Sequence, residues 1–198
     1  MTATEDPIDL LARALAQTAG LIDGIGAEQG IHPSTCRSWD VTQLVSHLLF
    51  DLRQFTLRAE GGDPDWSQPF DRVEGDWLHA FEAGAEELVA AWRAPGDLDG
   101  VIELPGGKHL PARFPLDQQI AEFAVHGWDV ARSTGQSTAG LDQEVGRAAL
   151  DWGRGALRPQ YRGSEEEHHS FGPEVAAPED APVYDRLAAF FGRDPEAR

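Results

Sequence analysis

Long amphipathic segments dominate this sequence, and "VTQLVSHLLFDLRQFTLRA" shows their pattern most plainly. Its apolar residues recur every three or four positions, at 41, 44, 45, 48, 49, 52 and 55. This spacing puts them on one face of an α-helix. The pattern therefore predicts a helix over about 40–59. Asp40, or Ser38 ahead of it, can cap its start by accepting a hydrogen bond from a free backbone N–H.

The same helical spacing recurs along most of the chain. It predicts further helices over 7–23, about 73–94, about 116–133, about 142–157 and 180–192. Pro7 suits a first helical position, and Gly135 is a stop signal for the helix before it. The segments between these helices are rich in Gly, Pro and Ser, which is typical of loops.

Two parts of the chain lack this spacing. Residues 95–115 contain two short extended pieces around Gly106 and Gly107, which either pair as a small hairpin or belong to a long loop. Residues 158–182 are rich in Pro, Gly and acidic side chains and can bury little apolar surface alone. This tail either drapes over the rest of the chain or is mobile.

These elements together predict an all-α fold, a helical bundle with extra C-terminal helical segments. A length of 198 residues suits a single domain. The sequence shows neither an internal repeat nor a second, strand-rich part. We therefore interpret residues 1–198 as one domain with a loop-rich tail from about 158.

The charge of the chain argues against two classes of partner. Sixteen Lys and Arg face thirty-four Asp and Glu, so the formal net charge is -18, and Lys108 is the only lysine. Nucleic-acid binding requires a basic face to displace counterions from phosphate, and an anionic membrane surface would be repelled in the same way. No run of about eighteen apolar residues is present to span a membrane. We therefore expect neither nucleic acid nor a membrane as a partner.

Cysteine usage and the N-terminus indicate the compartment. Cys36 is the single cysteine, which excludes an internal disulfide and fits a reducing cytosol. The start "MTATEDPIDLLARAL" is acidic and lacks the basic residues and long apolar run of a signal peptide. These features predict a cytoplasmic protein.

Polar residues interrupt the otherwise apolar helix predicted over 116–133. Glu122 and His126 are four residues apart, so they lie one turn apart on one flank of its apolar face. Buried polar groups cost free energy unless they are paired. His47 lies on the flank of the helix over 40–59, with Asp51 one turn further along. If the two helices pack in a bundle, His47, Glu122 and His126 could converge on one point.

Two imidazoles and one carboxylate are a recurrent ligand set for a divalent metal, and they leave a position for water or substrate. Bundle cores are a known place to build such sites from facing helices. Imidazole suits zinc, nickel, iron and copper, so this set does not choose the metal. The spacing also occurs without a metal, in which case these side chains would be partnered core or surface residues.

Two segments carry a family resemblance. "TCRSWDVTQLVSHLL", followed later by "EFAVHGWDVARSTG", resembles the DinB-like metal-binding superfamily. More closely, the pair resembles the N-terminal domain of mycothiol-dependent maleylpyruvate isomerase and its stand-alone relatives. The family pattern is W-x-V-x-x-L-x-x-H on one helix and E-x-x-x-H-x-W-D on another. The closing "FGPEVAAPEDAPVYDRLAAFFGRDP" also resembles the end of the stand-alone proteins, so the resemblance covers about 8–195.

This resemblance implies a fold and a ligand set. The fold is a DinB-like four-helix bundle with an up-down-down-up course and a long crossover, in which residues 95–115 precede the last bundle helix. The three metal ligands of the family fall on His47, Glu122 and His126, with zinc as the first expectation and nickel or iron as alternatives. Asp129 would then accept a hydrogen bond from a ligand histidine, or it would pair with Arg132 or another basic side chain.

The resemblance also implies a reaction class. The family's characterised activities use a low-molecular-weight thiol, which binds the metal as thiolate and adds to an electrophile. A mycothiol-dependent transferase or isomerase is therefore expected, with a small-molecule thiol and an electrophilic substrate as partners. The isomerase has an additional C-terminal domain for which 198 residues leave no room, so its specific reaction is not carried over. The alternative is a non-catalytic metal-binding protein used in sensing, storage or partner binding.

Several other residues allow more than one interpretation. Asp51, like Asp129, is a candidate outer partner of the metal ligands, whereas Trp39 and Trp128 are expected to serve packing. Cys36 is expected to be a small buried thiol rather than a metal ligand or nucleophile.

Two pairs of residues in the C-terminal part also allow more than one interpretation. His168 and His169 lie in an acidic segment where solvated histidines are expected. A homodimer suits such bundles, and Phe190 and Phe191 could serve its interface or equally cover the bundle.

Overall fold

The structure is a computed structural model that describes residues 6–36, 38–94, 96, 98–104, 108–164 and 171–197. Its helices are α1 (Pro7–Asp23), α2 (Val41–Ala59), α3 (Trp77–Arg93), α4 (Phe114–Thr134), α5 (Gln143–Ala156) and α6 (Val183–Phe190). Two 3-10 turns span Gln29–Ile31 and Pro159–Tyr161, and two short strands are β1 (Val101–Leu104) and β2 (Lys108–Pro111). The predicted all-α class is confirmed.

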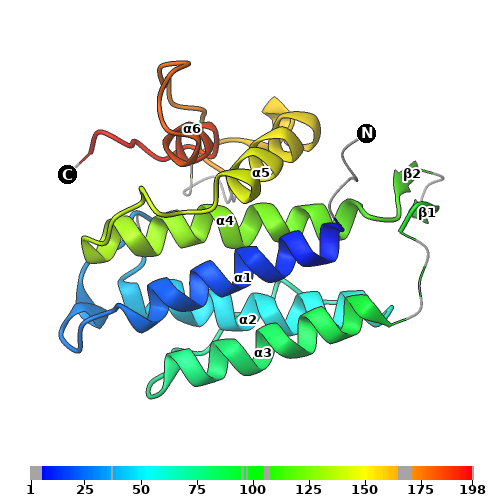
Figure 1. The fold of residues 1–198 in the computed structure, drawn as a ribbon, viewed down its shortest axis with the longest axis horizontal. Helices are drawn as coiled ribbons and strands as arrows, with labels where there is room; N and C mark the ends of the chain where they lie inside the picture. The colour runs from blue at the N-terminus through cyan, green and yellow to red at the C-terminus, as the bar shows by residue number, and fades with distance from the viewer. Residues whose placement is uncertain are drawn as a thin grey trace.

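Helices α1 to α4 form a four-helix bundle (Figure 1). Helix α4 packs against α1 and α2, and α3 packs against the same two helices. Helices α2 and α3 run in one direction, whereas α1 and α4 run in the other. The predicted up-down-down-up course is thus confirmed, with the strands in the long connection from α3 to α4. This arrangement makes α2 and α4 antiparallel neighbours.

Local capping sets where α2 begins. The side chain of Asp40 accepts a hydrogen bond from the backbone N–H of Gln43 at 2.8 Å, and the Gln43 side chain accepts one from the backbone N–H of Asp40 at 3.0 Å. This reciprocal pair satisfies two N–H groups that the helix leaves free. The predicted start at Asp40 is therefore correct.

Helix α3 begins later than its spacing predicts. The prediction placed its start at Val73, but the Asp76 side chain caps the helix by accepting from the N–H of His79 at 3.0 Å. Just before it, Gly75 has a φ of 109°, which few residues other than glycine adopt. Val73 instead donates its backbone N–H to the Ser46 hydroxyl of α2 at 2.8 Å. A contact distant in sequence therefore takes these residues out of the helix.

Helix α4 is the central element of the fold. It ends at Gly135, whose φ of 73° confirms the predicted stop. Its Trp128 is 0% exposed and donates its indole N–H to the Asp185 carboxylate of α6 at 3.0 Å. Helices α5 and α6 lie on the side of α4 away from the bundle (Figure 1).

Close contact between α5 and α6 buries the C-terminal phenylalanines. A Cβ added at Gly153 would lie 2.9 Å from the rings of both Phe190 and Phe191, so only glycine fits there without a shift. The two rings are 8% and 1% exposed. The two rings are thus covered within the chain, as one of the two alternatives from the sequence predicted, and the homodimer stays a prediction.

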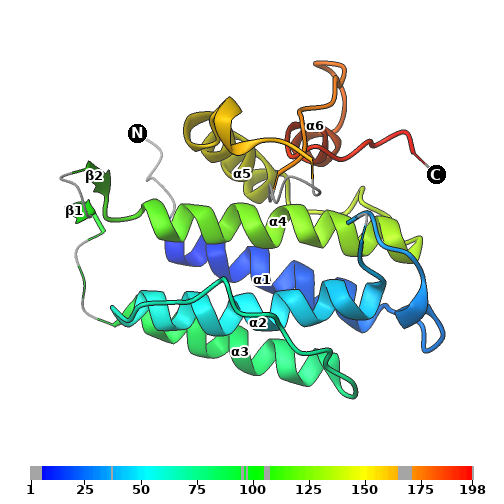
Figure 2. The same ribbon diagram turned by 180° about the vertical axis from the view of Figure 1, so that it is seen from behind.

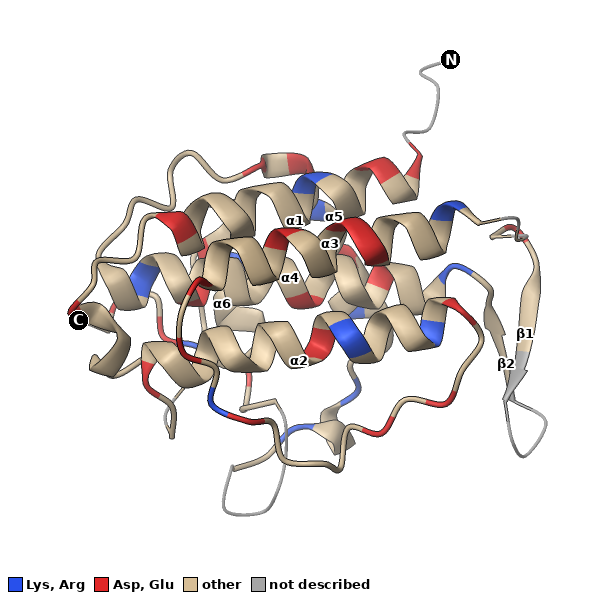
Figure 3. Ribbon diagram, turned by 90° about the horizontal axis from the view of Figure 1, so that it is seen from below, with Lys and Arg blue, Asp and Glu red and all other residues tan. Residues whose placement is uncertain are grey.

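The remaining predictions concern the connections. Strands β1 and β2 are antiparallel, with Val101 opposite Pro111, so the hairpin interpretation of residues 95–115 is confirmed. Acidic residues are spread over several helices, and the described Lys and Arg positions do not gather along any one helix (Figure 3). None of the helices in the described residues has the length and apolar character to cross a membrane.

Candidate metal-binding site

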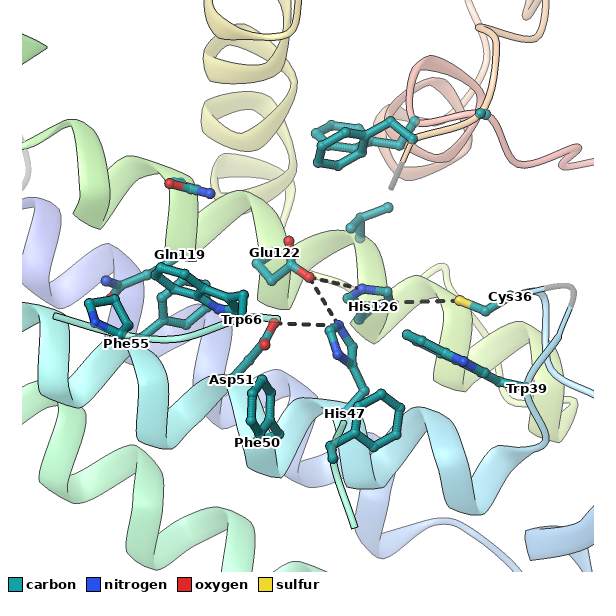
Figure 4. Close-up of a pocket in the computed structure, with 18 of the residues that line it drawn as sticks. Cys36, Trp39, His47, Phe50, Asp51, Phe55, Trp66, Gln119, Glu122 and His126 are labelled. Carbon is teal, nitrogen blue, oxygen red and sulfur yellow. Dashed lines mark hydrogen bonds and ion pairs between the residues drawn. The ribbon is translucent and has the colours of Figure 1, made fainter. Parts of the chain in front are cut away.

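Three side chains from α2 and α4 meet between these helices (Figure 4). Oε1 of Glu122 lies 3.3 Å from Nε2 of His47 and 3.0 Å from Nε2 of His126. One nitrogen or oxygen atom of each residue lies within 4.8 Å of the others. The structure thus brings together the three residues that the sequence predicted as metal ligands. Their convergence follows from the antiparallel packing of α2 and α4, which turns the flanks of the two helices toward each other.

Coupled charges set the protonation of Glu122 and His126. Burial alone would raise the pKa of Glu122, but the His126 charge and hydrogen bonds from both histidines lower it well below its ordinary range. Burial alone would lower the pKa of His126, but the Glu122 charge and the hydrogen bond to Asp129 raise it well above 6.5. Without a metal, the pair is therefore a carboxylate and an imidazolium.

The pKa values of Asp51 and His47 shift in the opposite directions to those of Glu122 and His126. Burial raises the pKa of Asp51 well above its usual range, and the nearby Glu122 carboxylate adds to this effect. Burial also lowers the pKa of His47 and keeps its imidazole neutral. A neutral imidazole is the form that binds a metal.

The arrangement fits a divalent cation. Oδ2 of Asp51 lies 3.4 Å from Nε2 of His47, and Asp51 is 3% exposed. Its other oxygen is buried and has no hydrogen-bond partner among the described residues. Such an atom costs free energy unless a positive group or a donor satisfies it. Oδ2 of Asp51 faces the same His47 nitrogen that faces Glu122, so Asp51 lies where it can turn toward a bound ion rather than hold the other ring nitrogen as an outer partner.

Asp129 lies behind His126. Its Oδ2 is 2.9 Å from Nδ1 of His126, so it can accept a hydrogen bond from that nitrogen and turn Nε2 toward Glu122. Arg193 donates to Oδ2 of Asp129 at 2.8 Å and to Oδ1 at 3.2 Å. Burial alone would raise the pKa of Asp129, but the Arg193 charge and the hydrogen bond with His126 lower it.

Asp129 does not pair with Arg132; of the alternatives from the sequence, the contact with a candidate ligand histidine and the pairing with another basic side chain, Arg193, are both present. Arg132 donates instead to the backbone carbonyls of Pro195 and Ala197, both at 2.9 Å. Arg193 was missed because it follows α6 and has no helical spacing that relates it to α4. Only the fold brings its side chain to Asp129.

Asp129→Asn is expected to weaken metal binding by about 10–100-fold. Asparagine keeps the shape of the side chain but removes the charge that holds the His126 ring. The dissociation constant would be measured by competition with a chelator, together with the free energy of unfolding. Asp151→Asn, an exposed substitution on α5, is the matched control. Reduced stability with unchanged metal affinity would show that Asp129 serves only as the counter-charge of Arg193.

Cys36 lies on the far side of His126 (Figure 4). Its Sγ is 4.0 Å from Nδ1 of His126 and 3.6 Å from Oδ2 of Asp129. These three residues could form a second ligand group. However, Nη2 of Arg193 lies 3.8 Å from Sγ and already supplies the positive charge there. The geometry therefore favours a metal at the first group, His47, Glu122 and His126, which faces Nε2 of His126 rather than Nδ1. Cys36 is partly buried, whereas the sequence predicted a buried thiol.

An open groove leads to the three candidate ligands. It has a volume of about 1630 Å³, above the range of roughly 300–1,000 Å³ that is usual for ligand pockets. Helices α2 and α4 form its floor, and its walls come from the loop after α2 and from the C-terminal segment. Residues from these walls include Trp66, Phe70, Phe171, Val175 and Phe191.

The loop after α2 is held along that helix (Figure 2). The backbone N–H of Asp65 donates to the Gln54 side chain at 2.8 Å, and Arg72 donates to Asp40 at 2.8 Å. The loop thereby runs back from the end of α2 to its start. These contacts place Phe70 5.6 Å from the ring of His47, measured between ring centroids.

Trp39 has a larger part in the site than the packing role predicted for it. Its ring centroid lies 4.8 Å from that of His47 and 5.4 Å from that of Phe70. It also lines the groove. Its ring therefore packs on a candidate ligand and borders the space where a substrate would bind. His168 and His169 lie outside the described residues.

Comparisons with known proteins show the family to which the chain belongs. Residues 11–131 match the family described as mycothiol maleylpyruvate isomerase N-terminal domain, a range that contains all three candidate ligands. The chain is also 30% identical over 188 residues to uncharacterized proteins of Mycobacterium tuberculosis strains CDC 1551 / Oshkosh and ATCC 25618 / H37Rv. Each alignment covers 95% of this chain and 98% of the relative. No solved structure matches the chain significantly. The chain therefore belongs to the mycothiol maleylpyruvate isomerase N-terminal domain family.

Proposed function

We propose that this protein binds a divalent metal through His47, Glu122 and His126 and acts as a metal- and mycothiol-dependent transferase or isomerase. The observation that carries the proposal is the meeting of these three side chains within 4.8 Å at the floor of an open groove. Two imidazoles and a carboxylate suit zinc first, and nickel or iron as well. Membership of the family supports mycothiol as the thiol.

The metal would supply one piece of chemistry: it lowers the pKa of a bound thiol, so that a thiolate forms near neutral pH. The protein's own side chains do the rest. Asp129 orients His126, and Glu122 offsets part of the positive charge. Three protein ligands would leave room for a further ligand, and the aromatic side chains that line the groove would shield a bound electrophile from water. Trp39 restricts the rotation of His47 by packing on its ring.

The groove distinguishes this proposal from a non-catalytic metal-binding protein. A sensing or storage site is expected to close its coordination shell with protein ligands. Here about 1630 Å³ of space adjoins the three side chains. That space favours a site that exchanges ligands and admits two small molecules.

The test combines metal loading with a thiol assay. Cobalt-loaded protein is expected to show a sulfur-to-metal absorption band when mycothiol is added, and the zinc form should consume thiol when electrophiles are supplied. Both signals should be lost in His47→Ala and retained in His79→Ala, an exposed histidine on α3. Metal binding without a thiol band or thiol consumption would identify a non-catalytic metal-binding protein and overturn the proposal.

A further inference from the structure

We infer that the groove takes an elongated apolar acid, whose carboxylate pairs with Arg58 while its other end reaches the candidate metal-binding site. The inference rests on the proposed function for the end of the ligand at His47. The end at Arg58 requires no metal and depends only on the side chains of the groove itself.

One face of α2 connects the two ends. His47, Asp51, Phe55 and Arg58 follow at intervals of four, four and three residues, and all four line the groove. These intervals keep the side chains on one side of a helix. At a rise of 1.5 Å per residue, Arg58 lies roughly 16 Å along the helix axis from His47. A ligand that touches both must therefore be long.

The space between these ends is mainly apolar. Because α4 runs antiparallel to α2, its start lies at the same end of the bundle as the end of α2, and Phe114 lines the groove with Ile102 and Leu110 of the hairpin. Further toward the candidate metal-binding site, the rings of Phe55 and Trp66 lie 5.8 Å apart, measured between centroids. Trp66 is 48% exposed, which is unusual for so large an apolar side chain. An apolar chain in the groove would cover it.

Arg58 supplies a positive charge to this groove. Two arginines in the described residues line the groove, and Arg193 is bonded to Asp129. Arg58 is partly buried, and its side chain forms no ion pair or hydrogen bond within the described part of the chain. Asp63 lines the same region but does not pair with it. A guanidinium presents a planar set of donors that matches a carboxylate in two parallel hydrogen bonds.

Gln119 adds a second donor without an acceptor. It lines the groove from α4 and is 0% exposed, and its Nε2 has no hydrogen-bond partner among the described residues. Its Oε1 accepts the indole N–H of Trp92 at 2.7 Å. Because an indole N–H can only donate, this bond fixes which amide atom is the nitrogen. Within the described residues, the groove therefore has two donors without an acceptor, Nε2 of Gln119 and the Arg58 guanidinium, and an oxygen-bearing anion suits both. Its unpartnered acceptor, Oδ1 of Asp51, belongs instead to the candidate metal-binding site beside His47.

The probes for this inference are ω-mercapto acids of graded chain length, each compared with the mercapto alcohol of the same length. In cobalt-loaded protein, the sulfur-to-metal absorption band reports the thiol end. The longest acid, mercaptoundecanoic acid, is expected to bind roughly tenfold or more tightly than its alcohol, the effect of a charge-assisted hydrogen bond. Short acids should show no such preference, because their carboxylate cannot reach Arg58.

Arg58→Gln should abolish the preference for the long acid and leave binding of the alcohol unchanged. Arg53→Gln is the matched control, since Arg53 is exposed on α2 and does not line the groove. Equal affinities of long acid and alcohol in the unaltered protein would overturn the inference. In that case the absorption band would still support the proposed thiol chemistry.

A second measurement needs no metal. Decanoate and decanol are titrated into metal-free protein, with tryptophan fluorescence as the readout and Trp66→Phe to identify the responding ring. A preference for decanoate that disappears in Arg58→Gln supports the inference even if no thiol band forms, a result that would count against the proposed function alone. No preference for decanoate would overturn the inference.

Discussion

His126→Ala is expected to reduce the bound metal from about one ion per chain to a negligible amount. His126 would supply one of only three protein ligands, and its Nε2 lies 3.0 Å from the shared Glu122 oxygen. Losing a ligand should weaken binding by more than the roughly 10–100-fold that loss of an outer hydrogen-bond partner costs. The measurement is elemental analysis of protein purified without a histidine tag, followed by titration with zinc.

His79→Ala is the matched control for this experiment. It removes an imidazole from the exposed face of α3 and leaves the groove untouched. If His126→Ala retains the metal, the ion is held elsewhere, and the site between α2 and α4 is not the metal site. If the unaltered protein holds no metal and binds none on titration, the proposed function fails at its first step.

Trp128→Ala is expected to lower the free energy of unfolding by about 3–5 kcal/mol. The side chain is 0% exposed, so its removal leaves a cavity inside the fold. It also removes the hydrogen bond to Asp185 and leaves that carboxylate without this donor. Urea unfolding followed by circular dichroism at one metal concentration would measure the change.

Trp128→Phe separates the two contributions. Phenylalanine fills most of the volume but cannot donate, so a smaller loss of about 1–3 kcal/mol is expected. Ile31→Ala, at a side chain that is 76% exposed, should change stability by less than about 0.5 kcal/mol. If Trp128→Ala changes the free energy of unfolding as little as Ile31→Ala does, the packing of α6 does not depend on the contact between Trp128 and Asp185. Loss of metal binding with unchanged stability would contradict the packing role predicted for Trp128.

Short-range patterns predicted most of the helices and the main residues of the site. Apolar spacing and caps located α1, α2 and α5 to within about two residues, because these signals act between residues on adjacent turns. The same periodicity placed Glu122 and His126 on one flank of α4. Together with the family resemblance, it also predicted that His47 would meet them.

Where the sequence patterns allowed alternatives, contacts between residues far apart in the sequence determined the structure. Asp129 pairs with Arg193 rather than Arg132, and the bond from Val73 to α2 delays the start of α3. The groove was not predicted at all, because its walls come from a loop and a C-terminal segment without regular spacing.

The sequence by itself thus determined the helices and the pairs of side chains that share a helix face. Tertiary structure alone decided which loop covers α2, which arginine reaches Asp129, and that Arg58 lines the groove containing His47. The physical reason is the sequence distance over which each interaction acts. Helix periodicity and capping depend on neighbours within one or two turns, whereas a groove forms where distant segments pack, and its shape depends on all of them together.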